Sequence, residues 1–327
     1  MSAQTPTATS NKRKLISLVL PVYNEEDNVE RAYKALCAEF EKLPQYDIEF
    51  VFTDNHSEDK TFSVLKTLAA SDRRIRVLRF NRNYGFQRSL LVAYRHARGD
   101  AAVQVDCDLQ DPPSLIPRFI ELWEKGHDVV VGLRRQRQES KLLTLGRRTF
   151  YNLLNKISDD QVTPNAGDFR LVSRPVLDKL RSIDDLSPYV RGLTSSLAAN
   201  QTGIAYDRAE RQHGSSKFPV RRLVGFALDG IIAHSVLPLR MASYVGVGIA
   251  IITAALSVVY FVGAVAGGRV WPSGFATTTI LILFGISMNA IFLGIIGEYL
   301  ARIYDIMRRR PLAVIEAAIN IGGTEGP

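Results

Sequence analysis

The sequence predicts an α/β domain built on a mostly parallel sheet, followed by amphipathic helices and two membrane-spanning helices. Up to about residue 235, short apolar and β-branched runs alternate with amphipathic segments of helical length. That alternation is typical of a parallel sheet covered by helices on both faces. Beyond Arg240, two stretches of 28 residues, 241–268 and 270–297, contain no Asp, Glu, Lys or Arg. Each is longer than the roughly 20 apolar residues needed to cross a bilayer.

The strands and helices of the first domain follow from periodicity and turn residues. The predicted strands are short apolar runs at 15–22, 48–53, 75–80, 101–105, 128–132 and 165–171. The predicted helices are amphipathic segments at 27–43, 59–70, 87–97, 115–125, 150–157 and 192–199. Ligands in parallel sheets bind beyond the carboxyl ends of the strands. Asn24, Asp54 and Asp106 all follow such ends, so we expect them to share one site.

Composition divides the chain into five parts. They are a disordered polar leader (1–14), the α/β domain (15–217), amphipathic juxtamembrane helices (218–240), two spans joined by a short loop near 267–274 (241–300), and a C-terminal tail (301–327). The leader lacks the apolar stretch of a secretory signal peptide. Basic residues flank the two spans on one side, whereas the connecting loop carries only Arg269. This asymmetry predicts that the α/β domain and both termini are cytoplasmic.

The formal net charge of +8 fits two kinds of anionic partner, nucleic acid and anionic lipid. No nucleic-acid-binding motif is present, and the basic residues gather near the predicted membrane segments, which favours lipid headgroups. The two cysteines, Cys37 and Cys107, lack the spacing of a metal site and suit a reducing compartment. We interpret Cys107 as a small buried side chain between two aspartates.

The segment DCDLQDPP, residues 106–113, directly follows a predicted strand and carries the strongest chemical signal. The carboxylates of Asp106 and Asp108 can converge on one hard cation, which prefers oxygen ligands and completes its shell with substrate phosphates. A short Asp-x-Asp motif is weak by itself, because most instances are solvated loop acids. The pair indicates a metal that holds a diphosphate, with a solvated loop as the alternative.

Six separated motifs occur in a fixed order: LPVYNEE (20–26), NRNYG (81–85), DCDLQDPP (106–113), GDFRL (167–171), AERQHGSSK (209–217) and GIIGEYLARIY (294–304). With the two C-terminal spans, they resemble the family 2 glycosyltransferases. Within that family the chain is similar to the polyprenyl-phosphate glycosyltransferases, which include dolichol-phosphate mannose synthase and the bactoprenol glucosyltransferases. The resemblance covers about residues 15–312.

The resemblance implies a GT-A fold, with a Rossmann-like, mostly parallel sheet. It also implies transfer of a sugar, with inversion, from a nucleotide diphosphate sugar to undecaprenyl phosphate or another polyprenyl phosphate. The implied nucleotide-sugar site consists of Pro21, Tyr23, Asn24, Glu25, Asp54, Asp106 and Gln110. Mg²⁺ or Mn²⁺ would be held by Asp106 and Asp108, with Asp108 a catalytic residue. Asp168 would position or deprotonate the acceptor; a structural pair with Arg170 is the alternative.

The acceptor phosphate is predicted to bind basic side chains. Arg134, Arg137 and Arg147 belong to a basic segment that follows a strand, and the planar guanidinium fork suits phosphate oxygens. Lys217, in a polar loop, is expected to close over the site. The alternative for the three arginines is a solvated basic loop or a contact with lipid headgroups, and the alternative for Lys217 is a surface position.

One feature of the sequence departs from the family pattern. Many relatives have Asp-Asp-Gly-Ser where this chain has DNHS at 54–57, so the role of Asn55 and the shape of the loop at His56 are open. Tyr84 and Phe86 are interpreted as packing and turn residues rather than as a stacking surface for a base.

The predicted product is a polyprenyl-phosphate-linked sugar for cell-envelope glycan modification, such as that of O-antigen. The resemblance favours a UDP-hexose donor, and it implies a multi-pass homo-oligomer in the bacterial inner membrane, with a tetramer as one arrangement. A processive polysaccharide synthase is disfavoured because the chain lacks a Gln-x-x-Arg-Trp motif and has only two predicted spans. An inactive membrane scaffold is disfavoured because Asp106, Asp108 and Asp168 are present. The identity of the sugar does not follow from the sequence.

Overall fold

The computed structural model describes residues 13–135, 166–183, 185, 188–207, 242, 244–249, 251–252, 255, 262, 274–307 and 311–322. These residues fall into two compact units. The first unit contains the described residues up to 207 together with 311–322, and the second contains those between 242 and 307. Each unit is described by itself.

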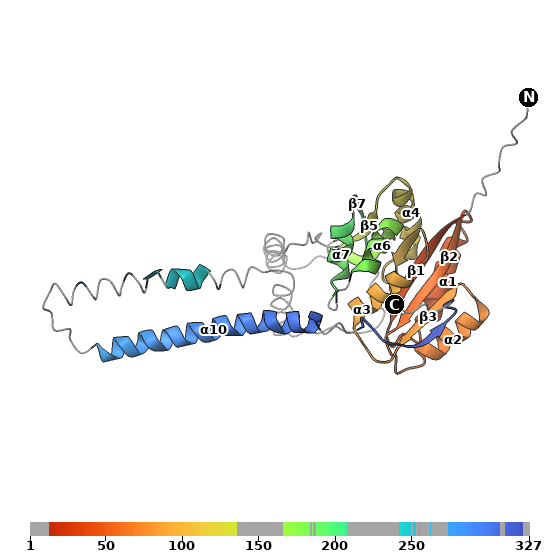
Figure 1. Cartoon of the computed structure of the whole chain (residues 1–327). Coiled ribbons are helices and arrows are strands. Elements are labelled where there is room, and N and C mark those ends of the chain that lie inside the picture. Colours follow the sequence, from red (N-terminus) through yellow and green to blue (C-terminus); the bar gives the residue numbers. More distant parts are fainter. Residues whose placement is uncertain are drawn as a thin grey trace, which may run out of the picture. The chain divides into compact units, whose positions relative to one another are not determined.

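Eight strands of the described residues form one sheet in the order β7-β5-β6-β4-β1-β2-β3-β8 (Figure 1). The strands are β1 (Lys14–Val22), β2 (Tyr46–Asp54), β3 (Ile75–Phe80), β4 (Ala101–Gln104), β5 (Val129–Arg134), β6 (Ala166–Ser173), β7 (Gln201–Tyr206) and β8 (Ile315–Ile319). Only β6 and β8 run antiparallel to their neighbours in this sheet. The predicted, mostly parallel α/β sheet is therefore confirmed, and β7 and β8 are additions to the six predicted strands.

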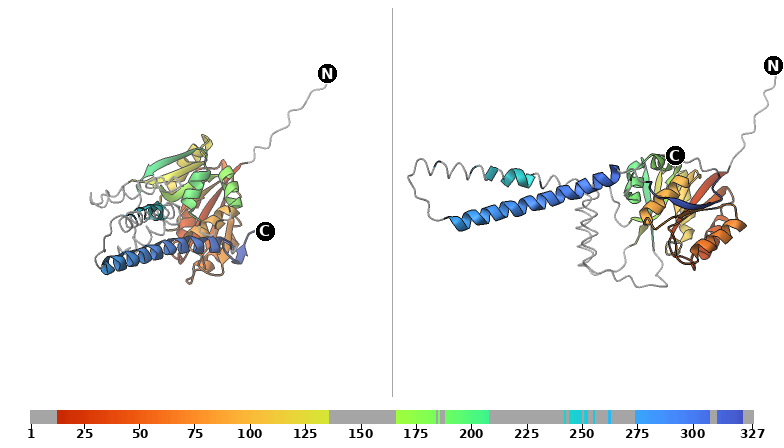
Figure 2. Two further views of the ribbon diagram at one scale, coloured as in Figure 1. Left: turned by 60° about the vertical axis from the view of Figure 1, so that its left-hand side comes forward. Right: turned by 60° about the horizontal axis from the view of Figure 1, so that its bottom comes forward.

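Helices cover both faces of this sheet (Figures 1 and 2). One face carries α1 (Val29–Phe40), α2 (Thr61–Ser71), the 3-10 turn η1 (Pro113–Leu115) and α4 (Ile116–Glu124). The other face carries α3 (Phe86–His96), α6 (Arg174–Ser182) and α7 (Val190–Leu197). Helix α6 was not predicted, and the predicted helix 150–157 lies outside the described residues.

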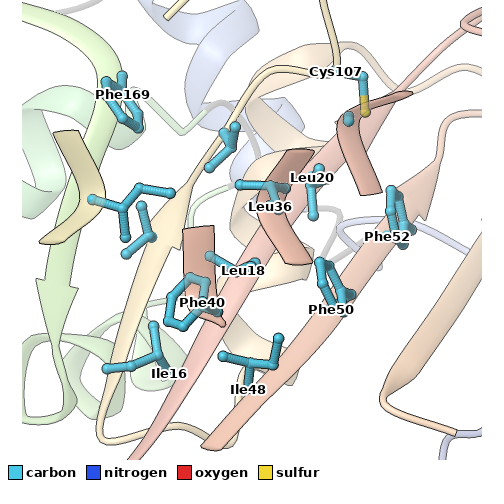
Figure 3. Packing of buried hydrophobic residues seen from close by; sticks show 14 of the residues in the cluster. Ile16, Leu18, Leu20, Leu36, Phe40, Ile48, Phe50, Phe52, Cys107 and Phe169 are labelled. Atoms are coloured by element: carbon cyan, nitrogen blue, oxygen red, sulfur yellow. The ribbon is translucent and has the colours of Figure 1, made fainter. Parts of the chain in front are cut away.

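Alternation along β1 explains why the sheet has two cores. Ile16, Leu18 and Leu20 enter one core, while Val19 enters the other, because successive side chains of a strand point to opposite faces. Figure 3 shows Leu36 and Phe40 of α1 lying over the first of these sets. These two residues are four apart and share one helix face. Burial of each such side chain contributes about 1.5–3 kcal/mol.

The C-terminal segment returns to the sheet as β8, which pairs antiparallel with the edge strand β3. Leu312 is buried in the second core, the one that also contains the buried side chains of α3. The Asn320 side chain donates hydrogen bonds to the backbone oxygens of Ala69 and Ile75, each at 2.8 Å. The segment 301–327, predicted as a tail, therefore supplies a strand to the α/β unit.

The second unit contains α10 (Phe275–Met307), a helix of 33 residues. Its window Phe284–Ala301 is long and apolar enough to cross a membrane, and none of that window is buried; it is the one such helix among the residues that the structure describes. A Cβ added at Gly246 would lie 3.6 Å from the Phe292 ring of α10. The two predicted spans are not confirmed, because most of 241–268 and the juxtamembrane segment 218–240 lie outside the described residues.

Candidate active site

A cavity of about 360 Å³ opens at the carboxyl ends of β1, β2 and β4, beside the first turn of α3. Five of the residues predicted for the donor or the metal line it: Pro21, Tyr23, Glu25, Asp106 and Asp108. The lining also contains residues that were not predicted to bind a ligand, namely Val22, Asn55, Asn83, Gly85, Phe86, Ser89 and Cys107. The strand-end placement of the carboxylates is the arrangement expected for a ligand site in a parallel sheet.

The two aspartates are held by the loop that follows β4. The backbone N–H of Val105 donates to the Val19 oxygen at 3.0 Å, so the pairing with β1 continues to the edge of the loop. Leu109 has φ of +54°, an uncommon conformation for a residue with a side chain, and the chain turns sharply there. The N–H of Gln110 donates to Asp108 Oδ1 at 3.1 Å. Gln110 is itself buried and does not line the cavity.

Cys107 belongs to the first core (Figure 3), which confirms its interpretation as a small buried side chain. It is 4% exposed. Burial, with nearby carboxylates acting in the same direction, raises the pKa of its thiol well above the ordinary value. The residue is thus a neutral packing group.

Asp54 is fully buried and does not line the cavity. Its Oδ1 accepts a hydrogen bond from the Ser57 N–H at 2.9 Å, and its Oδ2 accepts one from Arg79 Nη1 at 3.0 Å. Asn24 also turns away, since its Oδ1 accepts from the Glu58 N–H at 2.9 Å. Both residues, predicted to hold the nucleotide, here shape the loops behind the cavity wall.

Asn55 lines the cavity in place of its neighbour Asp54. Its Nδ2 donates to Asn83 Oδ1 and its Oδ1 accepts from the Tyr84 N–H, both at 2.8 Å. Asn83 Oδ1 also accepts from the N–H of Gly85, at 2.8 Å. Because one amide must accept and donate at the same time, a carboxylate at position 55 cannot make the same set of bonds.

His56, at the position where the resemblance leads us to expect glycine, adopts φ of +62°. Its Nδ1 lies 3.0 Å from the Phe80 oxygen, and this contact holds the ring against β3. The left-handed conformation costs a residue with a Cβ roughly 1–2 kcal/mol. The loop is therefore built with positive φ despite the missing glycine.

Aromatic side chains border the cavity at Tyr23 and Phe86, which are 41% and 39% exposed. Tyr84 instead packs edge-on against Phe80, with ring centroids 6.0 Å apart. The interpretation of Tyr84 as a packing residue is confirmed, whereas Phe86 lies at the cavity, and its interpretation as a turn residue stays a prediction. Gly85, with φ of +86°, ends the loop before α3 and leaves the ring of Phe86 at the cavity instead of in the core.

Asp168 forms a two-pronged ion pair with Arg191, a residue that the sequence analysis missed. Arg191 Nε donates to Asp168 Oδ1 at 2.6 Å and Nη2 donates to Oδ2. Asp168 is 8% exposed, while the Arg191 side chain is 36% exposed. The alternative role of Asp168, a structural pair with Arg170, is not among the described ion pairs; Arg170 donates instead to Thr194 Oγ1 and to the Gly167 oxygen. Burial lowers the pKa of Arg170.

Arg134 lies in a second network, with Asp111 and Tyr206. Its Nη2 donates to Asp111 Oδ2 at 3.2 Å, its Nε donates to Tyr206 Oη at 3.3 Å, and Tyr206 Oη donates to Asp111 Oδ1 at 2.5 Å. Burial alone would lower the pKa of Arg134, but the bonds to Tyr206 and Asp111 raise it. Burial raises the pKa of Tyr206, as does the bond to Asp111. The network ties the loop after β4 to β5 and β7.

The other residues predicted for the acceptor phosphate, Arg137, Arg147 and Lys217, lie outside the described residues.

Residues 17–181, which make up half of the chain, match the family described as Glycosyl transferase family 2. The chain belongs to glycosyl transferase family 2.

The similarity of this family 2 chain to its relatives extends over nearly its whole length. It is 38% identical over 308 residues to the prophage bactoprenol glucosyl transferase homolog of Escherichia coli K12, covering 92% of this chain and 98% of that protein. It is 36% identical over 305 residues to the SfII prophage-derived bactoprenol glucosyl transferase of Shigella flexneri, covering 92% and 97%. A solved structure of glucosyl-3-phosphoglycerate synthase from Mycobacterium tuberculosis, in complex with Mn²⁺, UDP and glucosyl-3-phosphoglycerate, is 20% identical with a TM-score of 0.44, over 71% of this chain and 84% of that one.

The carboxylate ligands that this family 2 chain offers at the cavity fit a hard divalent cation. Asp106 and Asp108 offer carboxylate oxygens at the cavity wall, the ligands that Mg²⁺ and Mn²⁺ prefer. The described residues contain no group of three or more His, Cys, Asp and Glu side chains that could hold a metal by themselves. Two carboxylates leave coordination positions for a diphosphate and water, as is usual for a cation bound together with a phosphorylated substrate.

Proposed function

We propose that this chain transfers a hexose from a UDP-sugar to a polyprenyl phosphate at a membrane surface, with inversion at the anomeric carbon. The observation that carries the proposal is the cavity at the strand ends, lined by Asp106 and Asp108, in a chain whose relatives of matching length are named bactoprenol glucosyl transferases. An oxygen of the lipid phosphate attacks the anomeric carbon, the bond from that carbon to the diphosphate breaks, and UDP departs.

The donor binds in the cavity beside α3. Tyr23 and Phe86 supply exposed aromatic faces for the base, and the polar side chains of Asn55 and Asn83 line the wall between them and β2. The first turn of α3, which begins at Phe86, presents the positive end of the helix dipole to the diphosphate.

Asp106 and Asp108 would hold the divalent cation. Bound there, it would supply Lewis-acid neutralisation of the charge on the departing diphosphate. Glu25 lies at the same wall and orients sugar hydroxyls by accepting their hydrogen bonds. Gln110 fixes the loop, through its N–H to Asp108, so that the carboxylates keep one geometry.

On the acceptor side, Asp168 positions Arg191 in preference to acting as a base. Both carboxylate oxygens of Asp168 already accept from the guanidinium, and a lipid phosphate is an anionic nucleophile that needs little deprotonation. The partly exposed guanidinium of Arg191 matches a phosphate in geometry and charge. We include Arg134, Arg137, Arg147 and Lys217 as further acceptor groups, with Arg134 acting from its network with Asp111.

The membrane supplies the acceptor at headgroup level. In this proposal α10 and residues 241–268 both cross the inner membrane, the α/β unit lies in the cytoplasm, and the chain assembles as a homo-oligomer. Support comes from the apolar window of α10, the uncharged stretch of 28 residues at 241–268 and the basic residues that flank the two segments.

The test uses full-length protein purified in detergent, with undecaprenyl phosphate, Mg²⁺ or Mn²⁺, and a panel of UDP- and GDP-hexoses. We expect mass spectrometry to detect a lipid heavier by one hexose with one of the UDP-sugars. Asp108→Asn should abolish that product, because an amide is a poor ligand for the cation. The matched control is Asp47→Asn, an exposed acid at the opposite end of β2. Absence of glycolipid with every donor, from folded protein, would contradict the proposal.

A further inference from the structure

Gln104, the last residue of β4, makes a contact that no motif of the sequence analysis predicted. Its side chain is fully buried, and Nε2 donates a hydrogen bond of 2.8 Å to Asp106 Oδ1. Residues 104 and 106 are two apart at a strand end and point to the same face, the one that α3 covers. The amide therefore holds one oxygen of the carboxylate from behind the cavity wall.

The orientation of this amide is set by the carboxylate. If the amide were turned over, Oε1 would face Asp106 Oδ1, and two acceptors would oppose each other. In the observed orientation the described residues offer no hydrogen-bond partner to Oε1, although this atom is buried. Buried polar atoms nearly always have a partner, so a position that leaves one without any calls for a functional reason.

Surrounding elements give the Gln104 side chain little freedom to move. Across the ladder between β4 and β6 it lies opposite Arg170, which is 2% exposed and bonded to Thr194 Oγ1 and the Gly167 oxygen. Tyr94 of α3 is fully buried in the core on the same face. A rigid donor in such surroundings fixes the direction of the carboxylate to which it is bonded.

We propose that Gln104 is a positioning residue for the divalent cation: its amide fixes the orientation of the Asp106 carboxylate, which would hold the metal together with Asp108. The inference rests on the proposed function, because it assumes that the cation binds at Asp106 and Asp108. Groups that hold metal ligands from behind typically contribute 10–100-fold to metal affinity. The role is specific to this residue type, since it requires a neutral donor next to a carboxylate.

The experiment measures Mn²⁺ binding in the presence of UDP, by the loss of the electron paramagnetic resonance signal of free Mn²⁺, on full-length protein in detergent. Gln104→Met keeps the volume and removes the donor, and we expect its Kd for Mn²⁺ to rise about 10–100-fold. Gln104→Asn keeps an amide that is too short to reach Asp106, and it should show a similar loss. The matched control is Gln201→Met on the edge strand β7, which should bind Mn²⁺ like the unaltered protein.

The outcomes separate this inference from the proposed function. One outcome refutes the role of Gln104 and leaves the metal site standing. In that outcome the unaltered protein binds Mn²⁺, Asp108→Asn does not, and the Kd of Gln104→Met lies within twofold of that of the unaltered protein. If the unaltered protein takes up no Mn²⁺ with UDP, the metal site and the role of Gln104 both fall. Should Gln104→Met not fold, judged by its melting temperature, the Kd of Gln104→Asn decides in the same way.

Discussion

Replacement of Arg79 by Met tests the assignment of Asp54 as a structural residue of the loop behind the cavity. Arg79 Nη1 lies 3.0 Å from the fully buried Asp54 carboxylate, Nη2 donates to the Ser57 oxygen at 3.3 Å, and the guanidinium lies over the Phe62 ring at 4.5 Å. Met retains much of the apolar stem but removes the charge. The Asp54 carboxylate would then remain buried with the Ser57 N–H as its described donor.

Removal of one partner from a buried ion pair costs about 3–5 kcal/mol. A domain of this size loses about 2–4 °C of melting temperature per kcal/mol, so we expect Arg79→Met to melt about 6–20 °C lower than the unaltered protein. The control is Glu316→Gln on β8. Glu316 is 49% exposed and lies 3.4 Å from Arg79 Nε, so it should change stability by about 1 kcal/mol or less.

The assay is thermal unfolding of the full-length protein in detergent, followed by intrinsic fluorescence, together with KM for the nucleotide sugar. An unchanged melting temperature combined with a large change in the donor KM would refute the argument. That result would mean that Asp54 faces the nucleotide and that Arg79 does not stabilise it in the free protein.

Three further predictions concern the loops and the helix ends. Asn55→Asp keeps an oxygen that accepts from the Tyr84 N–H but loses the N–H group that donates to Asn83. KM for the nucleotide sugar should therefore rise about 2- to 10-fold, with kcat little changed. A fall in kcat at constant KM would contradict a role of Asn55 in shaping the nucleotide-sugar site. Gly99→Ala should cost at least about 1–3 kcal/mol and lower the folded yield, because its Cβ would lie 2.6–2.7 Å from the backbone atoms Leu15 O, Ala101 O and Ser17 N. The matched control is Gly285→Ala, whose Cβ would meet no described atom within 4 Å beyond its own stretch of helix, and equal yields would contradict this prediction. Burial lowers the pKa of His96, and neighbouring arginines act in the same direction. In the unfolded chain the pKa is about 6.5, so as the pH falls through that value the unfolded chain takes up the proton first. The stability that is present above that pH is then lost. Between about pH 7.5 and about pH 5.5, His96→Gln should therefore lose less melting temperature than the unaltered protein, and equal losses would exclude His96 as a source of the acid sensitivity.

Much of the sheet could be predicted because its signals are local. The alternation that places Ile16 and Leu18 on one face and Val19 on the other is visible in nine consecutive residues of β1. The placement of Asp106 at a strand end required only the apolar run before it and the loop residues after it. Strand β8 could not be found in this way, because it pairs with a partner more than 230 residues away, as the contact of Arg79 with Glu316 illustrates.

The details of the site depended on contacts that spacing does not encode. Asp54 and Asn55 are neighbours at the end of β2, and only the backbone direction there determines that Asn55 faces the cavity while Asp54 faces Arg79. Arg191 reaches Asp168 from a separate helix, 23 residues further along the chain. The sequence around Arg191 and Asp168 contains other charged residues, and spacing alone does not indicate which of them form a pair.

The retention of positive φ at His56 shows how tertiary contacts override a local preference. Glycine would be favoured at this position, yet the contact of the ring with the Phe80 oxygen and its position 3.5 Å from Glu316 hold the residue there. A departure from the usual residue type was therefore a poor guide to the shape of the backbone.

The most direct test of the central claim is whether cleavage of the sugar donor depends on a lipid phosphate. Release of UDP from the UDP-hexose that gives product would be measured with undecaprenyl phosphate, with undecaprenol, which lacks the phosphate, and with no lipid. We predict rapid release with the phosphate and background release in the other two cases. Equal release in all three would contradict transfer to a polyprenyl phosphate and would indicate hydrolysis of the donor.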